Sequence, residues 1–213
     1  MAADDAEKLL RDSVEGSVLG DPRLLRFATG MRRLAWNHNV VSLGLSSGFI
    51  EPLESTSIHL VQHGILRLAA LFPTGIDDAA CRAEYNHEMR RTFEGVRDFV
   101  ILHYKVNGRQ ADPFWREMRD MVIPHSLQRR LDLWRSGGRL FRHDGDVFAI
   151  PSWAAVLSGQ GAWPAGRDPS TEALGQEQVR AALSDMRTAY TQTALRLPTH
   201  QDYLQQSGAL QPL

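Results

Sequence analysis

The fold is decided by a segment that runs from Trp36 to Ile58 and has the sequence WNHNVVSLGLSSGFIEPLESTSI. Its β-branched part, Asn39–Leu45, predicts a buried strand, and the small residues and proline that follow predict a turn. After the turn, apolar residues recur at steps of three and four residues: Ile58, Val61, Ile65, Leu68 and Phe72. This spacing predicts an amphipathic helix over Ser57–Leu71. The segment therefore predicts a strand, a turn and a helix N-terminus in direct succession.

The rest of the chain is expected to be mostly helical. Apolar periodicity, prolines at helix starts and glycines at helix ends predict helices over Asp4–Leu19, Ala79–Tyr104, Pro113–Met121, Pro124–Gly137, Pro151–Ser158 and Gly175–Leu197. The segments Arg139–Arg142 and Val147–Ile150 flank His143-Asp144-Gly145-Asp146, which predicts a hairpin. The fold class is therefore α+β, mainly α-helical, with a few short strands.

The composition is that of an ordinary globular chain. It has 213 residues, a net charge of −1, 43% hydrophobic residues and 23% charged residues. A charge this close to zero predicts no nucleic-acid partner, and no apolar stretch is long enough to predict a membrane span. The single Cys81 and the acidic first residues, which do not resemble a signal peptide, predict a reducing, cytoplasmic location.

The helix that begins at Ser57 is expected to favour an anion, because its first N–H groups are unpaired and carry a partial positive charge. Thr56 and Ser57 add hydroxyl groups at the same place, and Glu54 lies just before them. A plainer interpretation of Glu54 is a carboxylate that only stabilises the helix dipole. His59 and His63 have the spacing of a metal pair on a helix, but a third ligand is not evident, so packing is favoured and no metal is expected.

The segment from Trp36 to Ile58 closely resembles the flavin-dependent tryptophan halogenase family, and its Glu-Pro-Leu-Glu-Ser-Thr string is highly specific. Three further segments resemble the family in its order and at about its spacing: Arg97–Tyr104, Pro113–Arg116 and Pro151–Trp153. The resemblance implies an oxidoreductase that uses reduced FAD from a separate flavin reductase, oxygen and chloride or bromide to halogenate an aromatic substrate. In that family a hypohalous acid is activated by a lysine and a glutamate assists at the arene.

The resemblance assigns roles to residues around the turn. Glu54 matches the catalytic glutamate, which would stabilise the cationic ring and accept its proton. Ser55 matches the residue that contacts the catalytic lysine. Thr56 and Ser57 match the halide-binding pair, although some members have glycine at the second position. Positions that touch the flavin are matched by Leu45 and Ile58.

Substrate-binding positions match the family less closely. His103 and Tyr104 stand where many members have a tyrosine pair, and Gln110 stands about where a glutamate binds the substrate amine. Phe114 and Trp115 match aromatic walls of the site. Because a glutamine is a poorer partner than a carboxylate for an ammonium group, we expect an indole-like or phenolic substrate without an amino-acid head rather than free tryptophan.

The resemblance covers nearly all of residues 1–213 but only the C-terminal, substrate-side region of a family protein. The chain has no GxGxxG and no WxWxIP motif, and its two lysines, Lys8 and Lys105, lie outside the family motifs. We therefore expect a fragment that is inactive alone. The alternative hypothesis is a non-catalytic remnant, or an interaction module that needs a separate flavin-binding chain or a homodimer.

Overall fold

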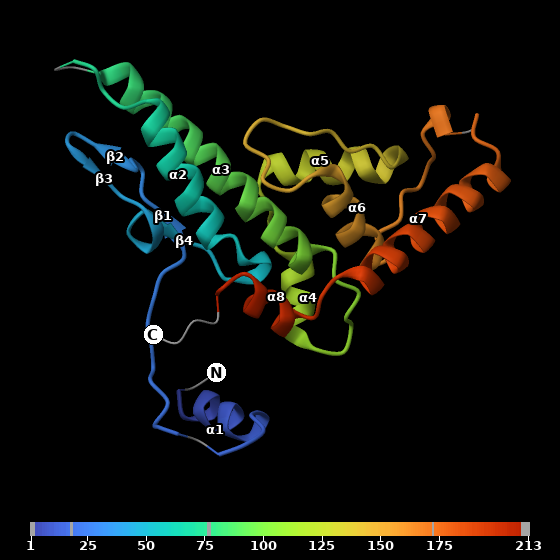
Figure 1. The fold of residues 1–213 in the computed structure, drawn as a ribbon, viewed down its shortest axis with the longest axis horizontal. Helices are drawn as coiled ribbons and strands as arrows, with labels where there is room; N and C mark the ends of the chain where they lie inside the picture. The colour runs from blue at the N-terminus through green and yellow to red at the C-terminus, as the bar shows by residue number, and fades with distance from the viewer. Residues whose placement is uncertain (1–2, 18, 76–77, 172, 210–213) are drawn as a thin grey trace. The chain divides into compact units, whose positions relative to one another are not determined.

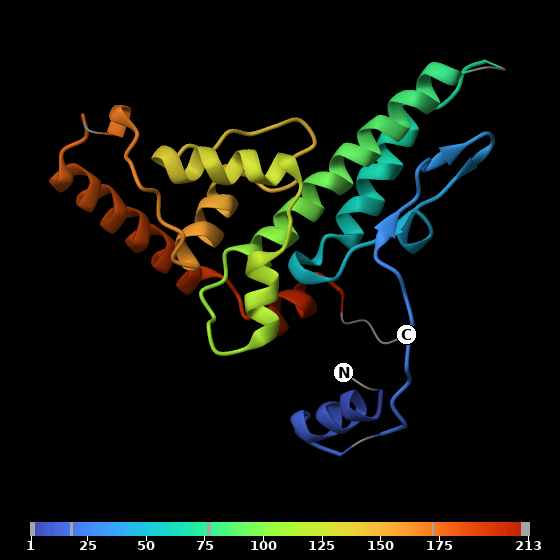
Figure 2. The ribbon, with the colours of Figure 1, turned by 180° about the vertical axis from the view of Figure 1, so that it is seen from behind.

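The computed structural model describes residues 3–17, 19–75, 78–171 and 173–209. The chain forms two compact units, one of residues 1–127 with 141–161 and the other of residues 128–140 with 162–213. Most of the described elements are helices, and Figures 1 and 2 show them from opposite sides. The helices are α1 (Ala3–Ser13), α2 (Ser57–Ala70), α3 (Ala79–Lys105), α4 (Pro113–Asp120), α5 (His125–Gly137), α6 (Ile150–Gly159), α7 (Gln176–Arg196) and α8 (His200–Gln206).

The strands are short and form two antiparallel pairs. β1 (Gly30–Met31) pairs with β4 (Gly48–Phe49), and β2 (Trp36–Asn37) pairs with β3 (Val40–Val41). Between β3 and β4, Gly44–Ser46 forms a 3-10 turn (η1). The mainly helical α+β architecture is thus confirmed, and among the described residues the strands are all only two residues long.

The prediction of a buried strand over Asn39–Leu45 is wrong. Only Val40–Val41 is extended and paired, with β2 as its strand partner, and Val40 is 63% exposed. Gly44 then adopts a left-handed φ of 61°, which ends the extended backbone and starts the η1 turn. The apolar run therefore forms the second arm of a small hairpin rather than a strand inside a sheet.

Helices α2 and α3 form the frame of the first unit and lie side by side in both views (Figures 1 and 2). Gly64 allows their close approach, because a Cβ atom there would lie 2.6 Å from the Leu43 side chain and 3.2 Å from the Tyr85 hydroxyl. One core cluster joins the hairpin to α3 and contains Ala35, Trp36, Tyr85 and Met89. A second cluster joins α2 to α3 and contains Leu60, Phe93, Val96 and Val100.

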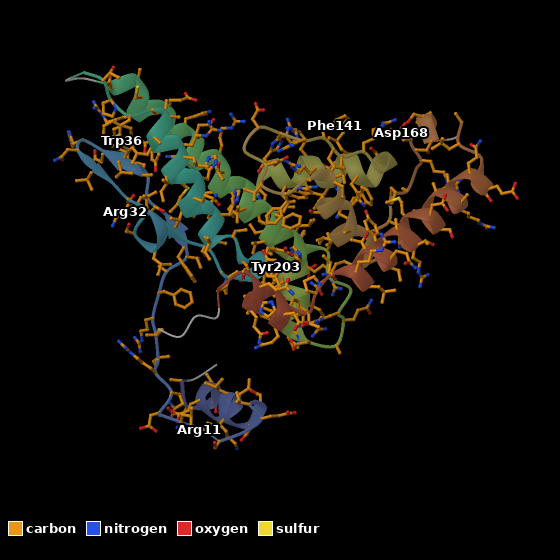
Figure 3. All side chains as sticks on the ribbon, in the orientation of Figure 1. Arg11, Arg32, Trp36, Phe141, Asp168 and Tyr203 are labelled. Atoms are coloured by element: carbon orange, nitrogen blue, oxygen red, sulfur yellow. The ribbon has the colours of Figure 1, made fainter. Side chains whose placement is uncertain are left out.

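Trp36 fixes the hairpin on this frame, and Figure 3 shows its side chain at β2. Its ring packs edge-on against Tyr85, with the ring centroids 5.6 Å apart. The Asn86 carboxamide accepts a hydrogen bond from the Trp36 backbone N–H at 2.8 Å and donates one to the Trp36 carbonyl at 2.8 Å. Because a single side chain pairs both backbone groups of Trp36, β2 is held at one place on α3.

The predicted hairpin over Arg139–Ile150 is also wrong, although its central turn is present. The Asp146 N–H donates to the His143 carbonyl at 3.1 Å, but neither arm is a strand. The two arms do not pair with each other, and each contacts a different partner. In the first unit Phe148 stacks on Phe99 at 3.8 Å, whereas in the second unit Arg139 forms an ion pair with Asp168 at 3.2 Å.

The predicted helices agree with the structure except at the N-terminus and near the C-terminus. Helix α1 ends at Ser13 rather than Leu19. Helix α8 was not predicted, and its N-terminus is capped by Thr199, whose hydroxyl accepts the Asp202 N–H at 3.2 Å. No helix among the described residues is long and apolar enough to span a membrane.

Candidate functional site

The turn before α2 has an unusual backbone. Leu53–Ser55 forms a 3-10 turn (η2) in which the Ser55 N–H donates to the Pro52 carbonyl at 2.8 Å. Glu54 and Ser55 have φ values of 68° and 53°, in the left-handed region that side-chain-bearing residues rarely adopt. Such strain is typical of functional sites, where the surroundings must hold it in place.

The C-terminal end of α3 holds this turn through two carboxylates. The Tyr104 hydroxyl donates to Glu51 Oε1 at 2.6 Å, and His103 Nε2 lies 3.1 Å from Glu54 Oε1. Leu53, between the two carboxylates, packs against the core cluster of α2 and α3. Two consecutive residues of α3 therefore face the two glutamates of the turn.

The side chain of His103 is also fixed from its other nitrogen. Nδ1 lies 2.8 Å from the backbone carbonyl of Phe99, one helical turn earlier, and the Phe99 ring packs edge-on against the imidazole at 5.0 Å. The His103 side chain is 17% exposed and that of Glu54 is 37% exposed. The imidazole is thus half-buried, and its carboxylate partner is more open to solvent.

The four residues predicted for halide and flavin come together at the start of α2. Thr56, Ser57, Ile58 and Leu45 all line a small cavity of about 190 Å³. Thr56 is buried, and no side chain of the described residues caps the first turn of α2. The helix N-terminus therefore presents backbone N–H groups and two hydroxyls beside a cavity large enough for a monatomic anion.

A second cavity of about 640 Å³ lies on the other side of Ile50 and Phe93, which line both cavities. Among the predicted substrate residues, Tyr104 and Phe114 line it, together with Glu51. Burial, followed by the hydrogen bond to Glu51 and the charge of that carboxylate, raises the pKa of Tyr104 to about 12. Tyr104 is therefore a neutral hydrogen-bond donor near neutral pH. Glu54 and His103 do not line this cavity.

The remaining predicted substrate residues lie at the edge of the cavity or away from it. Trp115 stacks on Tyr104 at 5.8 Å and packs edge-on against Phe114 at 5.1 Å, so it supports two residues of the cavity wall. The Arg109 guanidinium lies 4.4 Å above the Trp115 ring. Gln110 is exposed in the loop before α4 and does not line the cavity.

Sequence reasoning missed Glu51, although it is the first glutamate of the Glu-Pro-Leu-Glu string. Its spacing of three residues from Glu54 could have indicated that both carboxylates face one helix end. The histidine pair is explained by packing. His59 and His63 stack with ring centroids 6.3 Å apart, and His63 Nε2 lies 3.2 Å from the Thr92 hydroxyl. Burial lowers the pKa of His63, and the described residues contain no cluster of three or more metal-ligating side chains.

Comparison with known proteins places this arrangement in a family. The sequence model of the tryptophan halogenase family matches residues 1–176. A 7-chloro-L-tryptophan 6-halogenase from Kutzneria sp. (strain 744) is 30% identical over 96% of this chain and 40% of the relative. A tryptophan 6-halogenase from Streptomyces toxytricini is 36% identical over 62% of this chain and 25% of the relative. The chain belongs to the tryptophan halogenase family.

Solved structures similar to this chain include flavin-dependent halogenases. The one from Brevundimonas sp. BAL3 has a TM-score of 0.87 and 39% identity over all of this chain and 42% of its own. The one from Xanthomonas campestris has a TM-score of 0.88 and 40% identity over 97% of this chain and 42% of its own. The chain thus spans about two fifths of the length of these relatives and has the fold of the matching part.

Proposed function

We propose that this chain supplies the halide-side and substrate-side residues of a flavin-dependent halogenase that acts on an aromatic substrate. The observation that carries the proposal is the strained Glu54–Ser55 turn, which holds a carboxylate beside the uncapped N-terminus of α2. An electrophilic halogenation needs both an anion site for the halide and a carboxylate for the cationic ring.

Each residue of the turn has a chemical task in this proposal. The backbone N–H groups and hydroxyls of Thr56 and Ser57 would hold chloride or bromide at the helix end. Glu54 would stabilise the positive charge of the halogenated ring and accept its proton. Ser55 would contact the lysine expected from the flavin-binding region. Lys105 does not fill that place, because its ammonium group donates to the Met121 carbonyl at 2.8 Å.

The residues fit one part of FAD only. Leu45 and Ile58 are 76% and 82% exposed, and these apolar side chains would contact the flavin ring. The cavity beside them, about 190 Å³, is smaller than the roughly 300–1,000 Å³ that drug-sized ligands occupy. When bound, reduced FAD supplies, with oxygen, the oxidising power that makes the halide electrophilic. We infer that the remaining FAD contacts come from residues outside this chain.

We further propose a substrate that has no amino-acid head group. His103 and Tyr104 stand at the tyrosine pair of many family members, but here they face Glu54 and Glu51. Gln110 is exposed and carries no charge to pair with an ammonium group. An indole-like or phenolic ring has no ammonium group to pair, and aromatic and apolar side chains such as Phe114 would suffice to bind it.

A chimera tests the proposed function. This chain would replace the matching 42% of the Brevundimonas sp. BAL3 halogenase, and the product would be assayed with FAD, a flavin reductase, bromide and either indole or tryptophan. We expect brominated indole by mass spectrometry and a higher kcat/KM for indole than for tryptophan. Glu54→Gln should lower kcat by about 100-fold or more, the usual scale for a lost acid–base group.

The control substitutes an exposed glutamate on α3, Glu84→Gln, which should leave kcat unchanged. A folded chimera that binds FAD but brominates neither compound would reject the proposed function and favour the non-catalytic alternative. Titration of the 213-residue chain with FAD completes the test. Saturable quenching of flavin fluorescence by the chain alone would contradict the inference that the main FAD contacts lie outside it.

A further inference from the structure

We propose that His103 is the positioning residue and proton partner of Glu54, rather than a substrate-binding residue. This inference rests on the proposed function, because it assigns the route of the proton that halogenation releases. It starts from three observations: the contact of Nε2 with Glu54, the contact of Nδ1 with the Phe99 carbonyl, and the half-buried position of the imidazole beside a more exposed carboxylate.

The contact at Phe99 fixes which nitrogen carries a proton. A backbone carbonyl only accepts hydrogen bonds, so His103 Nδ1 must be protonated to donate to it at 2.8 Å. An imidazole whose Nδ1 is protonated has a lone pair on Nε2, unless that nitrogen is protonated as well. The carbonyl of Phe99 therefore sets the imidazole to offer Nε2 to Glu54.

The contact at Glu54 then requires one more proton. Nε2 and Oε1 are 3.1 Å apart, a hydrogen-bond distance, and two lone pairs do not attract at that distance. The proton belongs either to an imidazolium that donates to a carboxylate or to a carboxyl group that donates to a neutral imidazole. Both arrangements have one shared proton and the same net charge, so the two side chains hold this proton as a pair.

This pair can take up the proton of the substrate. An electrophilic halogen donor, such as hypohalous acid, forms a carbon–halogen bond with ring electrons while its halogen–oxygen bond breaks and its oxygen leaves as hydroxide. The ring C–H bond then breaks, its electrons restore aromaticity, and the proton moves to Oε2 of Glu54. Glu54 is now a neutral carboxyl group beside an imidazolium, so the net charge of the pair has risen by one, and the pair returns a proton to the hydroxide, which forms water.

His103 also helps to hold the geometry of Glu54. The left-handed backbone at Glu54 is strained, and its carboxylate would otherwise rotate freely in solvent. The imidazole is itself held by α3 through Phe99, so it fixes one carboxylate oxygen and leaves the other for the substrate. Glu51 faces Tyr104 in the same way, but its partner is a neutral phenol that donates a hydrogen bond to it and, unlike an imidazole, does not take up a proton.

Nuclear magnetic resonance of the full 213-residue chain tests the pair without any turnover. At about pH 6, where imidazolium groups are abundant, we expect both ring N–H protons of His103 to be visible and protected from solvent. In Glu54→Ala the Nε2 proton should be lost to exchange, whereas the Nδ1 proton should remain. An Nε2 proton equally protected, or equally absent, in both proteins would overturn the proposal.

A kinetic isotope effect in the chimera tests the proton route. With indole deuterated at the reacting carbon, the unmodified site should show no primary isotope effect, because the base is in place. In His103→Phe, which keeps the ring that packs on Phe99, kcat should fall by about 10- to 100-fold, the scale for loss of an outer-shell partner. KM should change little, and a primary isotope effect should appear.

Two further variants separate chemistry from structure. His103→Gln can still donate to Glu54 but cannot take up a proton, so it should keep the KM and show the isotope effect. His87→Phe, at an exposed position on the same helix, should change neither quantity. Equal isotope effects in the unmodified chimera and in His103→Phe would overturn the role of His103 but leave the proposed function standing. Absence of bromination in the unmodified chimera would overturn the proposed function and, with it, the role of His103.

Discussion

Replacing Asn86 by alanine should release the hairpin from α3. The carboxamide of Asn86 is the only hydrogen-bonding group among the described residues that joins the backbone of Trp36 to α3, and it does so with two bonds of 2.8 Å. The Trp36 residue is 5% exposed, so water does not readily replace these partners. Alanine removes both partners and adds none.

The size of the effect follows from these two bonds. Each hydrogen bond contributes about 1 kcal/mol net, and a buried backbone group left without a partner costs about 1–3 kcal/mol. Asn86 itself is half-buried, which lowers the cost because part of the gap becomes hydrated. We expect Asn86→Ala to lower the free energy of unfolding by about 2–4 kcal/mol.

Urea unfolding followed by near-ultraviolet circular dichroism measures the change, and amide hydrogen exchange localises it. The Trp36 N–H should lose most of its protection, whereas amides in the middle of α7, in the second unit, should keep theirs. The control is Asn37→Ala, the neighbouring position on β2, whose side chain is exposed. If Asn86→Ala lowers the stability by less than about 0.5 kcal/mol, or no more than the control does, the carboxamide does not hold the hairpin.

Three further predictions concern the core and the site. Tyr85→Phe should raise the free energy of unfolding by about 1 kcal/mol in urea unfolding, because the buried Tyr85 hydroxyl has no hydrogen-bond partner among the described residues; a loss of stability would reveal a partner. Asp98→Asn should lower it by about 2 kcal/mol in the same assay, because the buried Asp98 carboxylate accepts from Arg97 at 2.7 and 2.9 Å and also from Ser126. The raised pKa of Tyr104 predicts that the free energy of unfolding falls as pH rises from about 10 to about 12, because Tyr104 ionises at a lower pH in the unfolded chain than in the folded one. The free energy of unfolding measured across this range should decline less steeply in Tyr104→Phe. Equal declines in both proteins would contradict the raised pKa of Tyr104.

The long helices could be predicted from the sequence because their signals are local. The apolar residues of Ser57–Leu71 repeat at helical spacing, and α2 occupies Ser57–Ala70. Pro113 starts α4 because its missing N–H is not needed there, and Asp112 caps the helix by accepting the Phe114 N–H at 2.8 Å. Helix propensity, helix capping and apolar periodicity all favour a helix in these segments, and the tertiary contacts do not override that preference.

The strands were harder to predict because their outcome depends on distant partners. An apolar run such as Asn39–Leu45 becomes a buried strand only if other elements cover both faces of its sheet, and here Val40 is 63% exposed. Here β3 pairs with β2 alone, and Gly44 ends the extended backbone. Similarly, the turn around Gly145 was predicted, but the residues after it pack on α3 rather than on a second strand.

In the candidate site, too, the local signal is visible in the sequence, whereas the contacts with distant residues are not. The motif identified the segment Glu54–Ser57 because a rare string of residues is visible in one place. The partners of its carboxylates were not visible, since His103 lies 49 residues after Glu54 and its position at the end of a long helix fixes which turn it meets. The motif order predicts a substrate-binding place for His103, and its contact with Glu54 becomes visible only in the structure.

The strained backbone at Glu54 and Ser55 is held in place by contacts with the C-terminal end of α3. Two consecutive left-handed residues cost of order 1–3 kcal/mol each, so Glu54 and Ser55 adopt this backbone only if other contacts outweigh the cost. The contacts present are the packing of Leu53 on the core and the two carboxylate contacts with His103 and Tyr104. All of them come from α3 or from the core it shares with α2, and none needs a bound flavin. The Glu54 carboxylate, which we propose to be catalytic, is thus held in advance by contacts within this chain, so the isotope effects of His103 variants report on α3 and not on how tightly FAD is bound.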